Sequence, residues 1–133
     1  MIVADTSAWI DYLRGLMAPH TDLLDDALSL NRIIIADVII TELLQGIKDE
    51  KEFSATKSII YKLEYRDFVG KDIAYKTAQN YRKLRSLGIT VRKTIDVIIG
   101  TFCIENDCEL IHNDRDFDPM EKYLGLKVLR KVF

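Results

Sequence analysis

Apolar residues along the chain fall into short continuous runs, separated by longer stretches in which they recur at helical spacing. Two of these runs, at residues 2–4 and 32–36, predict strands that are buried on both faces, and residues 109–112 predict a third strand. Two less regular segments, 65–69 and 127–133, predict further strands. Charged side chains in the last segment are typical of a strand at the edge of a sheet.

The remaining stretches carry an apolar residue every third or fourth position, which predicts amphipathic helices. One helix follows the first strand as far as residue 13, and the others cover 23–30, 38–46, 53–62, 71–87 and 94–104. We expect Thr6 or Ser7 to cap the first helix and Asp37 to cap the third. Pro19 is expected in the turn before the second helix, and Gly88 just after the fifth.

Strands that alternate with helices are joined by right-handed crossovers and therefore lie parallel in one sheet. The sequence thus predicts an α/β fold: a central parallel sheet of four to five short strands with helices on both faces. A chain of 133 residues without repeats or linkers is expected to form a single domain over 1–133.

The composition narrows the class of protein. Hydrophobic residues make up 48% of the chain and charged residues 30%, as in ordinary globular proteins. No apolar run approaches the roughly 20 residues that cross a membrane, and no secretory signal begins the sequence. We therefore expect a cytoplasmic protein that does not enter a membrane.

Metal-binding patterns of cysteine and histidine are not found. The two cysteines and two histidines are too scattered for a tetrahedral zinc site, and the thiols are expected to stay reduced. The net charge of -2 weighs against a nucleic-acid binder, which usually carries a basic excess. A cation held by clustered acids would, however, reverse the field locally.

Acidic residues recur at one end of the predicted elements. Asp5 ends the first strand, and Asp114 and Asp116 follow the strand before them. Because parallel strands place their carboxyl ends on one edge, these three should lie together. Glu42 lies one turn into the helix that leaves the second strand, and Asp96 lies in the first turn of its helix, beside the apolar stripe.

Several carboxylates in one cleft repel each other strongly, so either their pKa values rise or a cation lies among them. Mg²⁺ or Mn²⁺ suits such an all-oxygen site. The sequence contains no identifiable Ser-His or Cys-His pair, so metal-assisted hydrolysis of a phosphodiester is the chemistry these residues fit best. The alternative for Asp5 taken alone is a helix cap.

Four acidic segments, taken in order, resemble the motifs of PIN domains. They are Asp-Thr-Ser at 5–7, Thr-Glu-Leu-Leu-Gln-Gly at 41–46, the start of the helix at 96–100, and His-Asn-Asp-Arg-Asp-Phe at 112–117. Their spacing and the chain length are most similar to the VapC-type toxins of bacterial and archaeal toxin–antitoxin pairs. Gly100 stands where a small residue, often Ala, is usual in the family.

The resemblance implies an Mg²⁺- or Mn²⁺-dependent endoribonuclease that forms a homodimer and is held inactive by a VapB-type antitoxin, whose tail enters the acidic cleft. By position, the catalytic acids would be Asp5, Glu42, Asp96 and Asp114, with metal bound by Asp5, Asp96 and Asp114, and support from Thr6, Ser7 and Asp116.

Basic residues near the predicted acidic edge are the candidates for holding RNA phosphates, because a carboxylate-lined cleft repels a polyanion unless cations flank it. These candidates are Arg14, Arg92, Lys93 and Arg115.

Two other classes of protein stay open. In a non-catalytic acidic binding module the acids would be only caps and solvated charges, with no metal dependence. A receiver-like Mg²⁺-binding phosphoacceptor domain should carry an acidic pair before the end of its first strand, where this chain has Val3 and Ala4.

Overall fold

The computed structural model describes residues 1–131 and is built on a five-stranded sheet. The strands are β1 (Ile2–Ala4), β2 (Ile33–Ala36), β3 (Glu64–Arg66), β4 (Glu109–Ile111) and β5 (Lys127–Val128). They lie in the order β3-β2-β1-β4-β5, and every neighbouring pair is parallel. The predicted α/β fold with a central parallel sheet is therefore confirmed.

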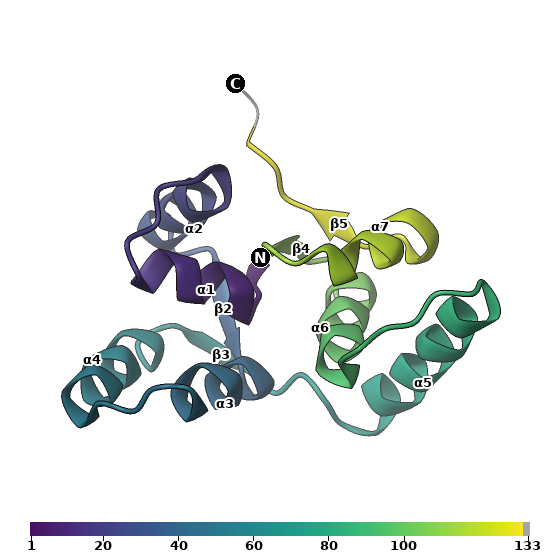
Figure 1. The fold of residues 1–133 in the computed structure, drawn as a ribbon, viewed down its shortest axis with the longest axis horizontal. Helices are drawn as coiled ribbons and strands as arrows, with labels where there is room; N and C mark the ends of the chain where they lie inside the picture. Colours follow the sequence, from purple (N-terminus) through teal and green to yellow (C-terminus); the bar gives the residue numbers. More distant parts are fainter. Residues whose placement is uncertain (132–133) are drawn as a thin grey trace.

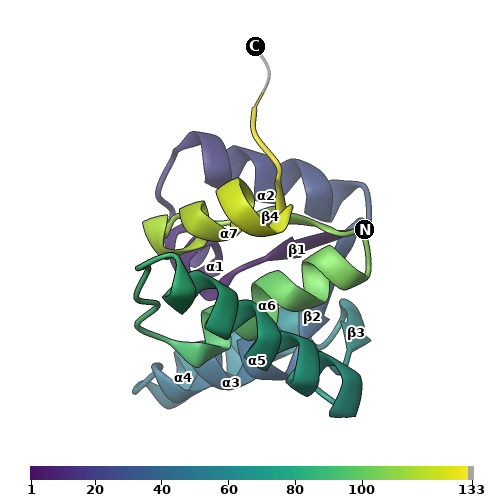
Figure 2. The same cartoon turned by 90° about the vertical axis from the view of Figure 1, so that its right-hand side faces the viewer.

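Helices cover both faces of the sheet, as an all-parallel sheet requires. They are α1 (Thr6–Leu13), α2 (Pro19–Ser29), α3 (Asp37–Gln45), α4 (Glu50–Ile60), α5 (Lys71–Ser86), α6 (Thr94–Glu105) and α7 (Asp118–Leu124), with a 3₁₀ turn η1 (Arg115–Phe117). Figure 1 shows α1 and α2 on one side of the sheet and α6 and α7 on the other, with α5 outside α6. Figure 2 looks onto this second layer.

Burial follows the apolar patterns of the sequence. Every residue of β1 and β2 is buried, whereas the edge strand β3 is exposed along its whole length. Helix α6 is apolar on nearly all sides because it lies between the sheet and α5. Phe102 of α6 stacks on Phe68, with ring centroids 3.6 Å apart, and this contact fixes α6 against the segment that follows β3.

Strand β1 lies between β2 and β4, and this position brings together the residues that follow the three strands. Val3 pairs with Ile34 on one side and with Leu110 on the other. The amide of Asp5 still donates to the Ile111 carbonyl, at 2.9 Å, after the strand has ended. The residues that follow β1, β2 and β4 therefore emerge along one edge of the sheet.

The starts of two helices differ from the prediction. Helix α2 begins at Pro19 itself, because proline lacks the amide hydrogen that the first turn would leave unpaired. Asp37 does not cap α3 but is its first residue, and Ala36 holds the cap position. The Asp37 carboxylate instead accepts from the backbone amide of Phe68, at 3.0 Å, and so ties α3 to the segment after β3.

Helix α4 starts at Glu50, three residues before the predicted start at residue 53. Its cap is Asp49, whose carboxylate accepts from the Glu52 amide at 2.8 Å. At the other end of the next helix, the prediction for Gly88 is confirmed. Helix α5 ends at Ser86 and Gly88 has a φ of 80°, the left-handed conformation that glycine adopts at no steric cost.

The C-terminal part holds the largest differences. The predicted strand over 65–69 is the shorter β3, and helix α7 was not expected at all. The sequence did carry signals for this helix: a proline in its first turn and Gly125 after its end, which has a φ of 81°. The predicted strand over 127–133 is reduced to β5, and Val132 and Phe133 lie outside the described residues. Within residues 1–131, no helix combines the length and apolar character that a membrane crossing demands.

Candidate active site

Asp5 joins β1 to α1 and is buried, with 3% of its surface exposed. It is itself the cap of α1: its Oδ2 accepts from the Ser7 amide at 3.1 Å and from the Ser7 hydroxyl at 2.7 Å. The expected cap at Thr6 or Ser7 is therefore wrong. Capping occupies one oxygen alone, because Oδ1 is buried and has no hydrogen-bond partner within the described residues. Asp5 is thus a cap that keeps a free oxygen.

Asp96 lies in the first turn of α6 and is 1% exposed. Its Oδ2 is also buried without a hydrogen-bond partner in residues 1–131. The pKa of Asp96 is raised to about 7, mainly by burial and next by the nearby Asp5 carboxylate, while Lys93 opposes the rise. Burial likewise raises the pKa of Asp5, against the hydrogen bonds from Ser7. The two inner acids therefore resist losing their protons.

Asp96 also belongs to a cluster of three aspartates. Asp96, Asp114 and Asp116 each bring a carboxylate oxygen to within 4.8 Å of the others. Asp114 caps η1, and its Oδ1 accepts from the Asp116 amide at 2.9 Å. Both aspartates of the 112–117 segment therefore belong to the cluster, including Asp116, which was expected only to support the metal ligands.

His112 fixes the backbone at Asp114. Its Nδ1 accepts from the Asp114 amide at 3.1 Å. Burial lowers the pKa of His112 below its ordinary value, so at neutral pH the ring is uncharged and can act as this acceptor. The direction of Asp114 is thereby set by the residue that ends the strand.

Glu42 approaches the same site from α3. It is half-buried, and its Oε1 accepts from the Thr6 hydroxyl at 2.8 Å. The Glu42 charge contributes to raising the pKa of Asp96, less than Asp5 and Asp114 do. Thr6 and Ser7, the two hydroxyls of the first motif, therefore serve different acids.

The four basic candidates are not equivalent. Arg92 is largely exposed and forms an ion pair with Asp116, at 3.2 Å. Lys93 precedes α6, and its charge acts on both Asp5 and Asp96. Arg14 lines a pocket of about 420 Å³ that also includes Glu42. Arg115 is exposed on η1 and forms no ion pair within residues 1–131.

The donor set fits a small divalent cation. All candidate ligands are carboxylate oxygens, two of them buried and unpartnered, and the clustered negative charge calls for a counterion. These residues could bind Mg²⁺ or Mn²⁺ and, with such an ion, support hydrolysis of a phosphate ester. The unpartnered oxygens are difficult to reconcile with acids that serve as caps or solvated charges only.

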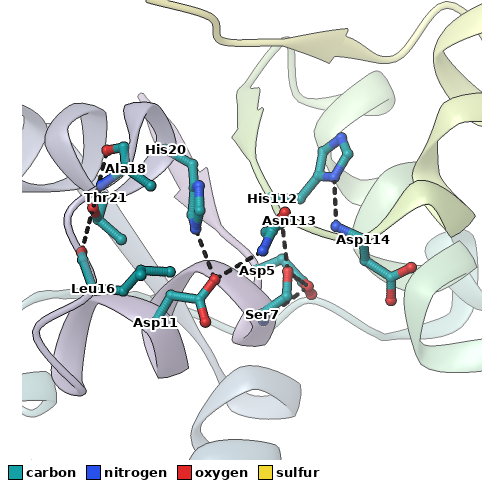
Figure 3. A network of polar contacts seen from close by, with 10 residues as sticks. All are labelled: Asp5, Ser7, Asp11, Leu16, Ala18, His20, Thr21, His112, Asn113 and Asp114. Atoms are coloured by element: carbon teal, nitrogen blue, oxygen red, sulfur yellow. Dashed lines mark hydrogen bonds and ion pairs between the residues drawn. The ribbon is translucent and has the colours of Figure 1, made fainter.

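The sequence interpretation missed Asp11 and Asn113. Figure 3 shows that Asn113 lies between α1 and the acids: its backbone amide donates to Ser7 Oγ at 2.9 Å, and its side chain reaches Asp11. Asp11 follows Ser7 by one helical turn, so the two side chains lie on one face of α1. That spacing was the signal available in the sequence.

Comparisons with known proteins show which proteins the chain resembles. The sequence model of the PIN domain matches residues 2–123. The "VapC ribonuclease Mb1587" of Mycobacterium bovis and the "Ribonuclease VapC11" of Mycobacterium tuberculosis are each 29% identical to the chain over 130 residues, which is 96% of either protein.

Solved structures show the same fold at low sequence identity. VapBC2 from Rickettsia felis, bound to a DNA fragment from its promoter, includes a chain with a TM-score of 0.78 at 16% identity, covering 99% of this chain and 100% of that one. DNA-bound VapBC from Salmonella typhimurium gives a TM-score of 0.77 at 20% identity, covering 97% of this chain and 98% of the other.

Proposed function

The chain belongs to the PIN-domain family, and from that premise we propose that it is a metal-dependent endoribonuclease, the toxin of a VapBC-type toxin–antitoxin pair. The observation that carries the proposal is the inner acid pair. Asp5 and Asp96 each present a buried oxygen without a hydrogen-bond partner in residues 1–131, and Asp96 shares a cluster of carboxylates with Asp114 and Asp116. A fold that served only to bind another protein would gain nothing from such costly groups.

Asp5, Asp96 and Asp114 would bind Mg²⁺ or Mn²⁺, and Asp116 would support them. When bound, the ion would lower the pKa of a coordinated water and stabilise negative charge on the scissile phosphate. The chain supplies the orientation: Ser7 holds Asp5, and the backbone of η1 holds Asp114.

Glu42 is the proposed catalytic residue that does not bind the metal, and its proposed role is that of general base. Its Oε1 is held by Thr6, which leaves Oε2 to accept a proton from an attacking water. Because Glu42 is half-buried and reaches the site from α3, it can touch the substrate without displacing the aspartates.

RNA phosphates would lie against Arg14, Arg92, Lys93 and Arg115. The basic residues at the C-terminal end are less suitable, because each pairs with an acid outside the acidic site, whereas Arg92 pairs with Asp116 of the site itself. The pairs are Lys127 with Asp107, Arg130 with Glu121, and Lys131 with Asp22. The cations around the acidic site therefore remain the better phosphate ligands.

The proposed partners follow from the family. The similar solved structures are described as VapBC complexes, so the partner would be a VapB-type antitoxin whose tail occupies the acidic site, and the toxin itself would be a homodimer in the cytoplasm. A basic side chain of that tail would satisfy the same oxygens that a cation would satisfy.

The decisive experiment is cleavage of total cellular RNA by the purified chain in Mg²⁺, in Mn²⁺ and in EDTA. We expect cleavage only with metal, and none by the Asp96→Asn variant. Asp107→Asn is the matched control. Asp107 is an exposed acid that pairs with Lys127 and does not belong to the acidic site. Cleavage in EDTA, or full cleavage by Asp96→Asn, would overturn the proposal. Absence of cleavage and of metal binding by the unaltered chain would favour the binding module.

A further inference from the structure

A hydrogen-bonded chain of side chains leads from α2 to the acidic site (Figure 3). Asp11 Oδ2 accepts from His20 Nε2 at 2.7 Å and from Asn113 Nδ2 at 2.9 Å. The side chains of Asp11 and His20 are 20% and 16% exposed. We name Asp11, His20 and Asn113 the brace. Its three members come from α1, α2 and the loop after β4, so it connects three separate elements.

Asn113 is held at two points of the same helix. Its side chain bonds to Asp11, and its backbone amide donates to Ser7 Oγ. Ser7 in turn donates to Asp5. One face of α1 therefore holds both the inner acid Asp5 and the residue directly before Asp114.

The loop at Asn113 needs such an attachment. No regular secondary structure lies between the end of β4 at Ile111 and the start of η1 at Arg115. The carboxylate of Asp116 lies close to that of Asp114, and like charges at such a separation repel each other. A hydrogen bond to an ionised carboxylate is about twice as strong as a neutral one, so the Asp11–Asn113 bond opposes this repulsion.

The ionisation of Asp11 agrees with this role. Burial acts to raise the pKa of Asp11, but hydrogen bonds from His20 and Asn113 outweigh it and hold the pKa below its ordinary value. Asp11 is therefore a carboxylate at neutral pH. Among the described residues it stands outside the Asp96–Asp114–Asp116 cluster, and its bonded oxygen is directed to the brace.

We propose that Asp11 and His20 are positioning residues for the metal site: acting through Asn113, they set the separation between Asp5 and Asp114. This inference rests on the proposed function, because it assigns these residues to the site that would bind the cation. Groups that orient metal ligands from behind typically change metal affinity by roughly 10- to 100-fold when they are removed.

The test measures the affinity for Mn²⁺ alone, by calorimetry or electron paramagnetic resonance. Asn113→Ala and Asp11→Ala should each weaken binding by roughly tenfold. The double variant should be no weaker than the single variants, because both changes break the same bond. His20→Gln should keep nearly full affinity, since the Gln amide can still donate to Asp11, whereas His20→Ala should lose it.

Tyr12→Phe provides the matched control. The Tyr12 hydroxyl donates to Asp25 at 2.7 Å and joins α1 to α2, as the Asp11–His20 bond does, but that pair makes no hydrogen bond to Asn113. A loss of melting temperature without a change in Mn²⁺ affinity is expected for this variant. Equal losses of affinity in Tyr12→Phe and Asp11→Ala would mean that the helix contact alone matters, and would overturn the brace.

A second measurement separates the brace from the proposed function. In metal-free protein, hydrogen exchange at the Asn113 and Asp116 amides should accelerate in Asp11→Ala and stay unchanged in Tyr12→Phe. If the unaltered chain neither binds Mn²⁺ nor cuts RNA, the proposed function fails and the brace loses its metal site. If the unaltered chain does both, while affinity and exchange are unaffected in Asp11→Ala and Asn113→Ala, the brace alone is overturned.

Discussion

The acidic site has an inner and an outer region that the protein treats in opposite ways. The inner carboxylates, Asp5 and Asp96, are at most 3% exposed, and each keeps one oxygen without a hydrogen-bond partner in the described chain. The outer carboxylates, Glu42, Asp114 and Asp116, are half-buried, and each accepts from a donor of the chain.

The difference shows where the fold gives up stability. A buried carboxylate without donors costs several kcal/mol unless it stays protonated or gains a counterion. The outer acids avoid this cost because they are only half-buried, in addition to accepting from Thr6, a backbone amide and Arg92. We infer that the inner pair is kept for the cation, which Asp114 would also bind, and that Glu42 and Asp116 serve orientation and contact with substrate.

The largest effect is expected from removing one inner charge. Asp5→Asn and Asp96→Asn should each reduce RNA cleavage to background while the chain stays folded, because Asn keeps the shape and, at Asp5, the capping oxygen. Asp116→Asn, at the outer position, should retain partial activity. Cleavage assays beside circular-dichroism melting curves decide this. Normal activity in both inner variants would remove the distinction between the regions.

Stability should fall as the pH rises, in metal-free protein. Asp96 has a folded pKa of about 7 against an ordinary value of 3.8, so between these values the folded state retains a proton that the unfolded state has lost. The stabilisation is complete below about pH 4 and disappears as the pH passes about 7. Since one pKa unit is worth about 1.36 kcal/mol, the loss is at most on the order of 4 kcal/mol.

Urea denaturation in EDTA from acidic to neutral pH tests this expectation. Acids with lowered pKa values, such as Glu121, act in the opposite direction, so the quantity to follow is the difference between the unaltered chain and Asp96→Asn. The free energy of unfolding of Asp96→Asn should exceed that of the unaltered chain by an amount that increases as the pH rises. A difference independent of pH would mean that the pKa of Asp96 is the same in the folded and unfolded states.

Divalent metal should restore what the inner acids cost. Binding to the folded state alone adds about 2.7 kcal/mol at a hundredfold excess over Kd. The melting temperature should therefore rise with Mg²⁺ or Mn²⁺, more at higher pH because protons compete for the same oxygens. Asp96→Asn should abolish the rise and Thr6→Val should preserve it, since Thr6 serves Glu42. A flat titration of the unaltered chain would contradict a formed site.

The smallest effect should come from the cations around the outer acids. Replacing Arg92 and Lys93 together by Gln should lower the salt dependence of RNA binding by about two units, one for each phosphate contact. Binding is best measured on the inactive Asp5→Asn background over a salt series. Gln at 127, 130 and 131 is the comparison set, because those cations are already paired with acids. If the slope falls only in this second set, RNA binds to the C-terminal cations and the proposed phosphate ligands are wrong.

The sequence alone determined the parts of this protein that depend on neighbouring residues. Continuous apolar runs specify β1 and β2, because a strand buried on both faces carries few polar side chains, and the apolar Leu110 and Ile111 specify β4. Parallel pairing then follows from the helices between them, and with it the common edge for Asp5, Asp114 and Asp116. Gly88 was equally predictable, because its backbone requirement is local.

Tertiary structure alone decided how the acids are arranged. Asp96 reaches Asp5 although α6 does not follow a strand directly, since the position of α6 depends on packing such as the Phe102–Phe68 stack. The hydrogen bonds from Asn113 to Ser7 and Asp11 join residues far apart in the chain. Local sequence patterns do not predict these hydrogen bonds, because the bonds form only when the sheet order brings β4 beside β1. The same packing leaves an oxygen of Asp5 and of Asp96 buried and unpartnered, which no pattern of residue types could reveal.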